Sequence, residues 1–451
     1  MDSPRVRLTI LAALLAALLA PSAATAAWGP TQDMGPLTGE FVYDGNARGD
    51  RILVWRVPEG FAFAQARPGE QLGAPRVLPR DPDRTEFAPR VEIDERGNAL
   101  LVWTYFDETD PEFEVRGPGP CCDGLRARVI RRDGTFTPPK TLAKAGNEVR
   151  LSDMQIAPNG TFGIVFTRSS YTSAARGVDA RFGTIARGFG PRENVFRDAA
   201  LGPFGLSFVS GRARLLYATG AESYYTTTPT VMRELERRGK GRWRSLGTRL
   251  KRTPVNRERL RVATSSRGEQ AVTWMREGKT PSYENQSVYA AVRAPGRAFR
   301  VRRIAVENYF QEAPLAIEPE GNVLTAWPSV RRVGIVTAAR RPRAGFGALT
   351  RFAEIADRRQ IGRIALDVNR RGHGLLAWSE RPFDAGDLEA RTRLVATFRN
   401  SRGSSLEHHV IEAEATDYTL SYAVTLDREG RGHVAYGAGG RLRVVAARIG
   451  G

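Results

Sequence analysis

Short apolar runs recur along the chain in a fixed relation to a glycine. Before each glycine lies a segment in which apolar and polar residues alternate, such as Val91-Glu92-Ile93. After it comes a continuous apolar run, such as Ala99-Leu100-Leu101-Val102-Trp103. Alternation is typical of a strand with one covered face, and a continuous run of this length is typical of a strand covered on both faces. Each copy therefore predicts two strands joined by a tight turn, with the second strand in the interior.

A large aromatic residue follows the turn glycine by six positions in eight places. The pairs are Gly49/Trp55, Gly97/Trp103, Gly160/Phe166, Gly211/Tyr217, Gly268/Trp274, Gly321/Trp327, Gly372/Trp378 and Gly430/Tyr436. Successive glycines are 48, 63, 51, 57, 53, 51 and 58 residues apart. A period of this size indicates an array of repeated units, each built from a few secondary-structure elements.

A second turn glycine followed by a large residue indicates another hairpin in each repeat. The pairs are Gly134/Phe136, Gly188/Phe189, Gly241/Trp243, Gly296/Phe299 and Gly345/Phe346, with Leu72 and Leu406 in this position in repeats one and seven. Four short strands per repeat, with no room for a long helix, are the content of one β-propeller blade. The sequence predicts an all-β fold, a single propeller of eight four-stranded blades; seven blades are the alternative.

The two ends of the chain complete each other in this prediction. The last repeat stops near Arg448, after its third strand, and so lacks a fourth. The segment that begins Trp28-Gly29-Pro30 resembles a fourth strand elsewhere, Phe189-Gly190-Pro191. We expect the N-terminal strand to complete the last blade, which would pair the edges that an open array exposes.

Residues 1–26 have the layout of a cleaved secretory signal peptide. Arg5 and Arg7 precede an apolar run over 8–20 that is too short to span a bilayer, and small residues end the segment at Ala26. The prediction is a signal peptide over 1–26 and a propeller over 27–451. We expect a secreted, extracellular protein without stable membrane insertion.

Composition and charge raise the question of an anionic partner. The chain has 68 Lys and Arg against 49 Asp and Glu, a net charge of +19, and only 5 of the cations are Lys. Arginine binds carboxylate and phosphate groups through paired hydrogen bonds, so an anionic partner is one interpretation. The arginines are spread over all repeats, and the alternative is that they serve as general surface cations. We expect no nucleic-acid partner and a monomer.

The second hairpin carries a resemblance to a known family. Arg132-Asp133-Gly134-Thr135-Phe136 resembles the Asp-box turn of sialidase-like propellers, which reads Ser-x-Asp-x-Gly-x-Thr-Trp, although the Ser and the Asp spacing differ in every copy. The whole repeat looks like those of secreted actinobacterial proteins with sialidase-like propellers of degenerate Asp-box type. The resemblance implies the propeller fold over the entire mature chain.

The connections between second and third strands carry the candidate ligand-binding residues. They are short in repeats one, six and eight, long in the other repeats, and should emerge on one face. Tyrosine among Ser, Thr and Asn combines rigid contacts with adaptable hydrogen bonds, which suits glycans or peptides. The candidates are Tyr105, Asp107, Glu108, Tyr171, Tyr224, Tyr225 and Tyr283. Solvated loops without a ligand are the alternative.

Cys121 and Cys122 are adjacent in the longest of these connections. Outside the cell they would tend to be oxidised. A disulfide between neighbouring residues would be strained, since their Cα atoms lie closer than the usual range. A disulfide that clips the loop is the first interpretation, with free thiols or an intermolecular bond as alternatives.

No motif assigns a catalytic residue, a metal ligand or a cofactor. His408 and His409 are adjacent in a predicted strand and should point to opposite faces, while His373 and His433 belong to other repeats. The seven tryptophans all occupy repeat positions, which makes them framework residues. We expect no catalytic residue, no metal and no cofactor.

The sequence favours a binding or scaffold module over an enzyme. Its partner would be an extracellular glycan, a cell-wall polymer or a protein, recognised through loops on one face. The alternative, which the resemblance implies, is a sialidase-like glycoside hydrolase. Such an enzyme needs three arginines on the substrate carboxylate, a tyrosine activated by a glutamate, and an aspartic acid.

Overall fold

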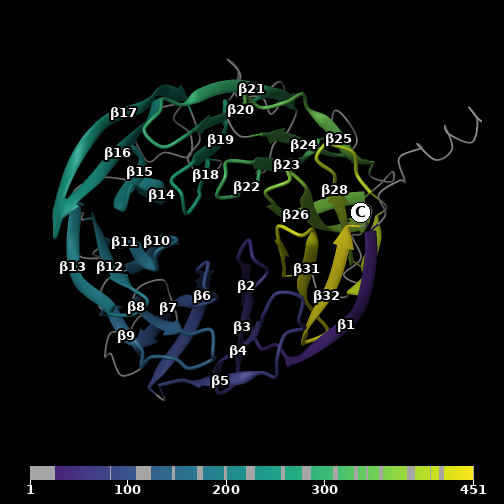
Figure 1. Cartoon of the computed structure of the whole chain (residues 1–451), viewed down its shortest axis with the longest axis horizontal. Helices are drawn as coiled ribbons and strands as arrows, with labels where there is room; N and C mark the ends of the chain where they lie inside the picture. Colours follow the sequence, from purple (N-terminus) through teal and green to yellow (C-terminus); the bar gives the residue numbers. More distant parts are fainter. Residues whose placement is uncertain are drawn as a thin grey trace, which may run out of the picture.

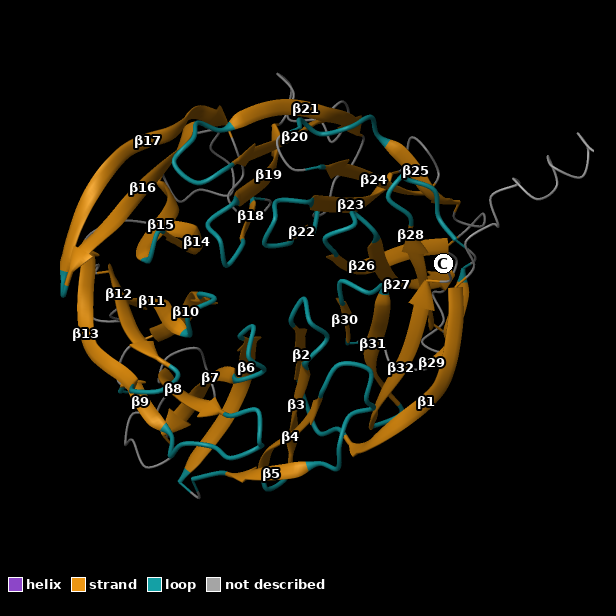
Figure 2. Ribbon diagram, viewed as in Figure 1, coloured by secondary structure: helices purple, strands orange, loops and turns teal. Residues whose placement is uncertain are grey.

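In the part of the chain that the computed structural model describes, thirty-two antiparallel strands form eight four-stranded sheets arranged in a ring (Figures 1 and 2). The structure describes residues 26–81, 83–107, 123–144, 148–169, 176–197, 201–219, 229–254, 260–276, 286–307, 313–329, 334–341, 344–354, 359–382, 392–406, 408–415 and 421–449. Within these residues there is no helix, and so none that could cross a membrane. The predicted all-β propeller is confirmed.

The first four blades follow the order of the chain. Blade 1 contains β2 (Phe41–Gly45), β3 (Arg51–Val57), β4 (Gly60–Ala66) and β5 (Arg76–Pro79). Blade 2 contains β6 (Arg84–Ile93), β7 (Ala99–Asp107), β8 (Asp123–Ile130) and β9 (Lys140–Ala143). Blade 3 contains β10 (Glu148–Ile156), β11 (Thr161–Ser169), β12 (Arg176–Thr184) and β13 (Gly188–Arg197). Blade 4 contains β14 (Leu201–Val209), β15 (Arg212–Thr219), β16 (Pro229–Gly239) and β17 (Arg242–Pro254).

The last four blades complete the ring. Blade 5 contains β18 (Arg261–Thr264), β19 (Gln270–Arg276), β20 (Gln286–Arg293) and β21 (Arg300–Glu307). Blade 6 contains β22 (Leu315–Ile317), β23 (Val323–Ser329), β24 (Gly334–Arg340) and β25 (Thr350–Glu354). Blade 7 contains β26 (Arg359–Val368), β27 (Gly374–Pro382), β28 (Thr392–Arg399) and β29 (His409–Ala415). Blade 8 contains β30 (Tyr422–Leu426), β31 (Arg431–Ala438), β32 (Arg441–Ile449) and the N-terminal β1 (Ala26–Pro36).

The N-terminal strand closes the ring, as the sequence predicts. β1 pairs antiparallel with β32 from Ala26 opposite Ile449 to Pro36 opposite Arg441, and so forms the outer edge of blade 8. The two strands lie side by side in Figure 1, although they come from opposite ends of the chain. Eight blades are therefore present, and the seven-bladed alternative is wrong.

The turn glycines and the aromatic residues have the predicted places. All eight first-turn glycines have positive φ, between 75° and 96°, which a residue with a side chain rarely adopts. The eight aromatic residues lie on the second strand of their blades, and each is 9% exposed or less. The repeat therefore encodes a tight turn followed by a buried strand.

The core consists of eight apolar clusters, one between each pair of neighbouring blades. In β3, Leu53 and Trp55 pack toward blade 8, while Ile52 and Val54 pack toward blade 2. This is why the second strand of each repeat is apolar on both faces. Closure of the ring gives every blade two apolar neighbours.

The antiparallel order divides the ring into two faces. The first and third strands begin, and the second strands end, on what we name the loop face. The opposite turn face carries the hairpins between first and second strands and between third and fourth strands. The innermost strands, β2, β6, β10, β14, β18, β22, β26 and β30, surround the central axis (Figure 1).

Candidate functional site

Most of the sequence-predicted ligand-binding residues lie outside the described residues. These are Glu108, Tyr171, Tyr224, Tyr225 and Tyr283, together with Cys121 and Cys122. Asp107 ends β7 on the loop face, where its backbone pairs with that of Arg84. The role of these residues stays a prediction.

Tyr105 lies inside blade 2 and not in an exposed loop. Its side chain is on β7 and is 2% exposed. The guanidinium carbons of Arg84 and Arg126 lie 4.8 and 5.1 Å from the centre of its ring. A Cβ atom at Gly124 would come within 2.2 Å of that ring, so the glycine makes room for it. Tyr105 therefore belongs to the packing of the blade, and its ring does not offer the predicted surface contact.

A cavity of about 670 Å³ lies at the centre of the ring on the side of the loop face. Arg261 and Tyr422 line it, and each is the first residue of an innermost strand, which begins on the loop face. We name it the loop-face cavity. The described residues that line it are Arg90, Arg261, Pro314, Leu315, Pro328, Gly362, Arg363, Ile364, Ala365, Leu366, Tyr422, Ala423 and Val424.

Three arginines from three blades line this cavity. Arg90 is on β6, Arg261 on β18 and Arg363 on β26. Burial, and to a smaller extent the charge of Arg363, lowers the pKa of Arg261. Within the described residues, neither Arg90 nor Arg363 forms an ion pair. Guanidinium groups in this arrangement can hold a carboxylate or sulfate through paired hydrogen bonds.

Irregularities in two innermost strands help to bring the arginines to the cavity. Arg90 and Arg261 both stand seven residues before their turn glycines, whereas Arg363 stands nine before its own. Arg363 lies within a register shift of β26 between Ile361 and Ile364, and Arg90 follows a register shift in β6. A bulge redirects the side chains beside it. The distance of an arginine from its turn glycine therefore does not by itself identify the three arginines of the cavity.

Tyr422 forms a fixed part of the wall. Its hydroxyl donates a hydrogen bond to the carbonyl oxygen of Arg363, and the backbone N–H of Ser379 donates to it at 3.1 Å. Burial raises the pKa of this phenol. A phenol with a raised pKa is less easily ionised, so Tyr422 is a poorer nucleophile than a free tyrosine.

Carboxylates deeper in the channel connect neighbouring blades. Asp44 accepts the backbone N–H of Ile93 at 2.9 Å, and Glu92 accepts that of Ile156 at 3.0 Å. The same contact joins Asp153 to Leu206 at 2.5 Å and Asp367 to Leu426 at 2.7 Å. In all four, a side chain of one innermost strand binds the backbone of the next blade. This repeated geometry favours a structural role for the carboxylates.

Burial raises the pKa of these channel carboxylates. The pKa of Asp44 and of Asp153 rises to about 6, and that of Asp367 to about 7. Burial, with the charges of Asp44 and Asp153, also raises the pKa of Glu92 well above its ordinary value. Arg90 partly offsets this, because its charge favours the ionised forms of Glu92 and Asp153. The channel therefore has cations at its loop face and carboxylates of weakened acidity below them.

A second cavity of about 410 Å³ continues the channel toward the turn face. It shares Leu366 and Val424 with the loop-face cavity, so the two are neighbours along the axis. Asp44, Glu92 and Asp367 line it. Among the described residues, no group of three or more His, Cys, Asp or Glu side chains is arranged to hold a metal ion.

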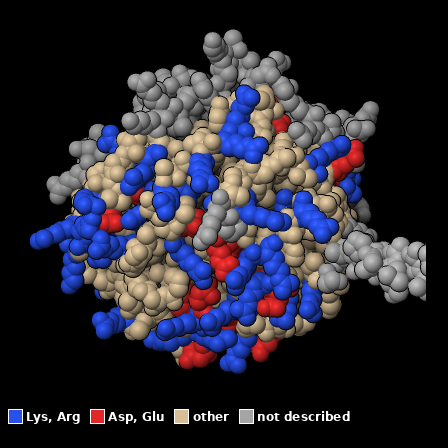
Figure 3. Space-filling model, turned by 45° about the horizontal axis from the view of Figure 1, so that its top comes forward, with Lys and Arg blue, Asp and Glu red and all other residues tan. Residues whose placement is uncertain are grey.

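The surface charge on the face shown in Figure 3 is spread out. Lys and Arg side chains are scattered across the face seen in Figure 3, with Asp and Glu between them. Many of the arginines are paired: Arg214 with Glu236 at 3.0 Å and Arg237 with Glu193 at 2.6 Å are examples. Arg90 and Arg363 of the loop-face cavity differ from these because they have no ion-pair partner among the described residues.

Comparison with known proteins finds similar folds but no family. No family model matches the sequence, and no curated protein matches it. Among solved structures, a Hadza microbial sialidase has 13% identity and a TM-score of 0.38, with 94% of this chain and 92% of that one covered. An ulvan lyase, described as a new family of polysaccharide lyase, has 9% identity and a TM-score of 0.44, with 93% and 95% covered. The propeller domain of a trilobed protease from Pyrococcus furiosus has 9% identity and a TM-score of 0.44, with 80% and 97% covered.

Proposed function

We propose that this chain is a secreted binding protein whose loop-face cavity holds an acidic group of an extracellular glycan or cell-wall polymer. The observation that carries the proposal is the set of Arg90, Arg261 and Arg363, which come from three blades to one cavity. The charge of Arg363 disfavours the charged form of Arg261, because like charges repel. A bound carboxylate or sulfate group would offset that repulsion.

A uronic acid fits this cavity better than a neutral sugar. Its carboxylate accepts paired hydrogen bonds from a guanidinium group, while its ring packs on apolar wall residues such as Leu315 and Ile364. The long connections of blades 2 to 5 and 7 leave from strand ends on the same face. Residues such as Tyr171, Tyr224 and Tyr225 are proposed to contact neighbouring sugars of the polymer.

Binding without chemistry is favoured over glycoside hydrolysis by the groups near the arginines. The channel carboxylates are each bound to a backbone N–H, and Tyr422 has a raised pKa. Glycoside hydrolysis needs two carboxyl groups, or an activated nucleophile with an acid, facing the scissile bond. Sugar release from a panel of acidic and neutral glycans would contradict a purely binding role.

The direct test measures retention of acidic oligosaccharides. Oligogalacturonate is titrated calorimetrically against the wild type and against Arg363→Gln, with a neutral oligosaccharide of equal length as the reference ligand. The variant removes one guanidinium group that has no ion-pair partner among the described residues, so the fold is expected to persist. We expect roughly tenfold weaker binding of the acidic ligand.

The matched control is Arg402→Gln, an exposed arginine in the β28–β29 hairpin on the turn face. It changes the net charge equally but leaves the cavity intact. Equal losses in both variants would indicate a general charge effect and contradict the site. Equal binding of acidic and neutral ligands by the wild type would contradict the proposed ligand class.

A further inference from the structure

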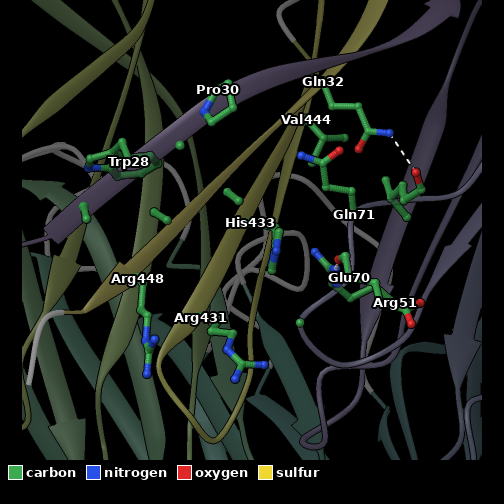
Figure 4. A pocket seen from close by; sticks show the side chains of 16 residues that line it. Trp28, Pro30, Gln32, Arg51, Glu70, Gln71, Arg431, His433, Val444 and Arg448 are labelled. Atoms are coloured by element: carbon green, nitrogen blue, oxygen red, sulfur yellow. Dashed lines mark hydrogen bonds between the residues drawn. The ribbon is translucent and has the colours of Figure 1, made fainter.

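A cavity of about 340 Å³ lies between blade 8 and blade 1 (Figure 4). Its described lining residues include none from the innermost strands. It is bounded by β1, β31 and β32 on one side, and by the start of β3 and the β4–β5 connection on the other. The side-chain amide of Gln32 donates a hydrogen bond of 2.7 Å to the carbonyl of Leu72, which joins the closing strand to blade 1. We name it the closure pocket; it shares no lining residue with the loop-face cavity.

Arginines dominate the polar lining of the closure pocket. Arg51, Arg431 and Arg448 line it together with His433, and among the described lining residues Glu70 is the only carboxylate. Figure 4 shows Arg51 and Glu70 on the side of blade 1, with Arg431, His433 and Arg448 on the strands of blade 8. Within the described part of the chain, none of the three arginines forms an ion pair.

Arg431 and Arg448 are directly opposite each other on β31 and β32. Residues paired in this way have side chains on the same face of the sheet, and like charges in such a pair are destabilising. His433, two residues after Arg431, faces the same side. An anion between the two guanidinium groups would turn this repulsion into attraction.

Arg51 supplies a buried donor without an acceptor. It is 3% exposed, and one of its terminal nitrogens donates to the backbone carbonyl of Glu70. Its Nε is buried and has no hydrogen-bond partner in the described residues. A buried N–H without an acceptor costs free energy.

His433 lies on β31 and lines the same pocket as these cations. Burial and the charges of Arg51 and Arg431 lower its pKa to about 3. It is therefore neutral at physiological pH and adds no further repulsion. A neutral imidazole can donate one hydrogen bond to an oxyanion.

We propose that the closure pocket binds the oxyanion group of a small ligand, a phosphate, sulfate or carboxylate, between Arg51, Arg431 and Arg448. The site is separate from the loop-face cavity and lies beside the strand that closes the ring. Occupancy would hold β31 and β32 against blade 1. The ligand would therefore stabilise the closed ring.

The test uses the full chain carrying Arg363→Gln, so that the loop-face arginines contribute less to anion binding. Phosphate, sulfate and acetate are each compared with chloride at equal ionic strength, by calorimetry and by thermal unfolding. We expect at least one of the three to bind saturably with one site per chain and to raise Tm. The order of the three affinities identifies the preferred oxyanion.

Arg448→Gln is the informative variant because Arg448 is exposed and, among the described residues, unpaired, so its loss leaves the fold intact. It should weaken oxyanion binding roughly tenfold, since one charged donor is lost. It should also raise Tm in chloride, because the opposed charge is removed. The control Arg297→Gln, an exposed arginine of the β20–β21 hairpin, should change neither property.

Two results would overturn the proposal. One is that no oxyanion raises Tm above the chloride reference. The other is that Arg448→Gln binds the preferred oxyanion as tightly as its parent does. The comparison of Arg448→Gln with its parent separates this site from the loop-face cavity, because Arg448 lines only the closure pocket. This proposal can therefore fail while the proposed function stands.

Discussion

In three repeats, the position five residues before the turn glycine carries a carboxylate that lines the channel. Asp44, Glu92 and Asp367 each stand five residues before a turn glycine, and each binds a backbone N–H of the next blade. The bond is made inside the channel, where burial disfavours the carboxylate charge. These side chains therefore connect blades but reduce stability when ionised.

Asp367→Asn should be more stable than the wild type at high pH. The folded-state pKa of Asp367 is about 7, above the value near 3.8 that is expected in the unfolded chain. The protonated carboxyl group therefore contributes stability that is fully present below pH 4 and is lost as the pH rises through 7. Asparagine is neutral and its side-chain oxygen can accept the N–H of Leu426. At pH 8 we expect a gain of roughly 2 kcal/mol in the free energy of unfolding, with a much smaller difference at pH 5.

Urea unfolding of both proteins at the two pH values measures this gain. Exposed Asp133, whose carboxylate accepts hydrogen bonds from Thr135 and whose pKa is lowered, is the matched control. Asp133→Asn should show no gain at pH 8. A loss of stability in Asp367→Asn at both pH values would contradict the claim that the ionised Asp367 carboxylate lowers the stability of the fold.

The arginines of the loop-face cavity could not be identified from the sequence. The chain has 63 arginines, and a one-dimensional pattern does not say which of them face a common space. Arg90 and Arg261 share a repeat position, but Arg363 reaches the cavity from a register shift in β26. Tyr105, conversely, looks like a loop residue because it precedes acidic residues, whereas Arg84 and Arg126 cover its ring.

At the scale of elements, the repeat was predictable because its signals are local. A glycine with positive φ and a buried aromatic six residues later define one hairpin, and all eight hairpins obey the rule. The atoms that pack around each turn can come from a neighbouring blade, which the local sequence does not show. A Cβ atom added at Gly211 would meet no atom within 4 Å, whereas one added at Gly268 would lie 2.5 Å from Val209 Cγ2 and 2.9 Å from the oxygen of Phe208.

Substitution of these two glycines should therefore differ in cost. Both have similar positive φ, 75° and 86°, so alanine is strained at each by about 1 kcal/mol. Gly268→Ala should lose at least about 2 kcal/mol more than Gly211→Ala, because it also clashes with blade 4. Chemical denaturation of the two variants gives the difference. Equal losses in the free energy of unfolding would show that blade 4 shifts to accept the added methyl group without further destabilisation.

At the scale of the molecule, stability depends on closure by β1. Met34 packs in the cluster between blades 8 and 1, and Trp28 packs on Phe398 and His409 of blade 7. β1 begins at Ala26, beside the predicted cleavage site, so removal of a signal peptide after Ala26 would keep almost the whole strand.

A chain that begins at residue 37 should lose cooperative stability. Its β32 would be an exposed edge, and the apolar clusters on both sides of blade 8 would open. We expect a large fall in Tm and concentration-dependent association, measured by calorimetry and light scattering. Addition of a peptide of residues 26–36 should restore part of the lost Tm. An unchanged Tm in the truncated chain would contradict the role of β1.

The central claim is that the loop-face arginines bind an acidic group of a polymer. The most direct measurement is a coupling experiment with calorimetry: oligogalacturonate and its carboxyl-reduced form are each titrated against the wild type and Arg363→Gln. If the guanidinium group and the carboxylate bind each other, each single change weakens binding roughly tenfold and the two together cost little more. Losses that multiply, or a reduced ligand that binds as well as the acid, would contradict the account.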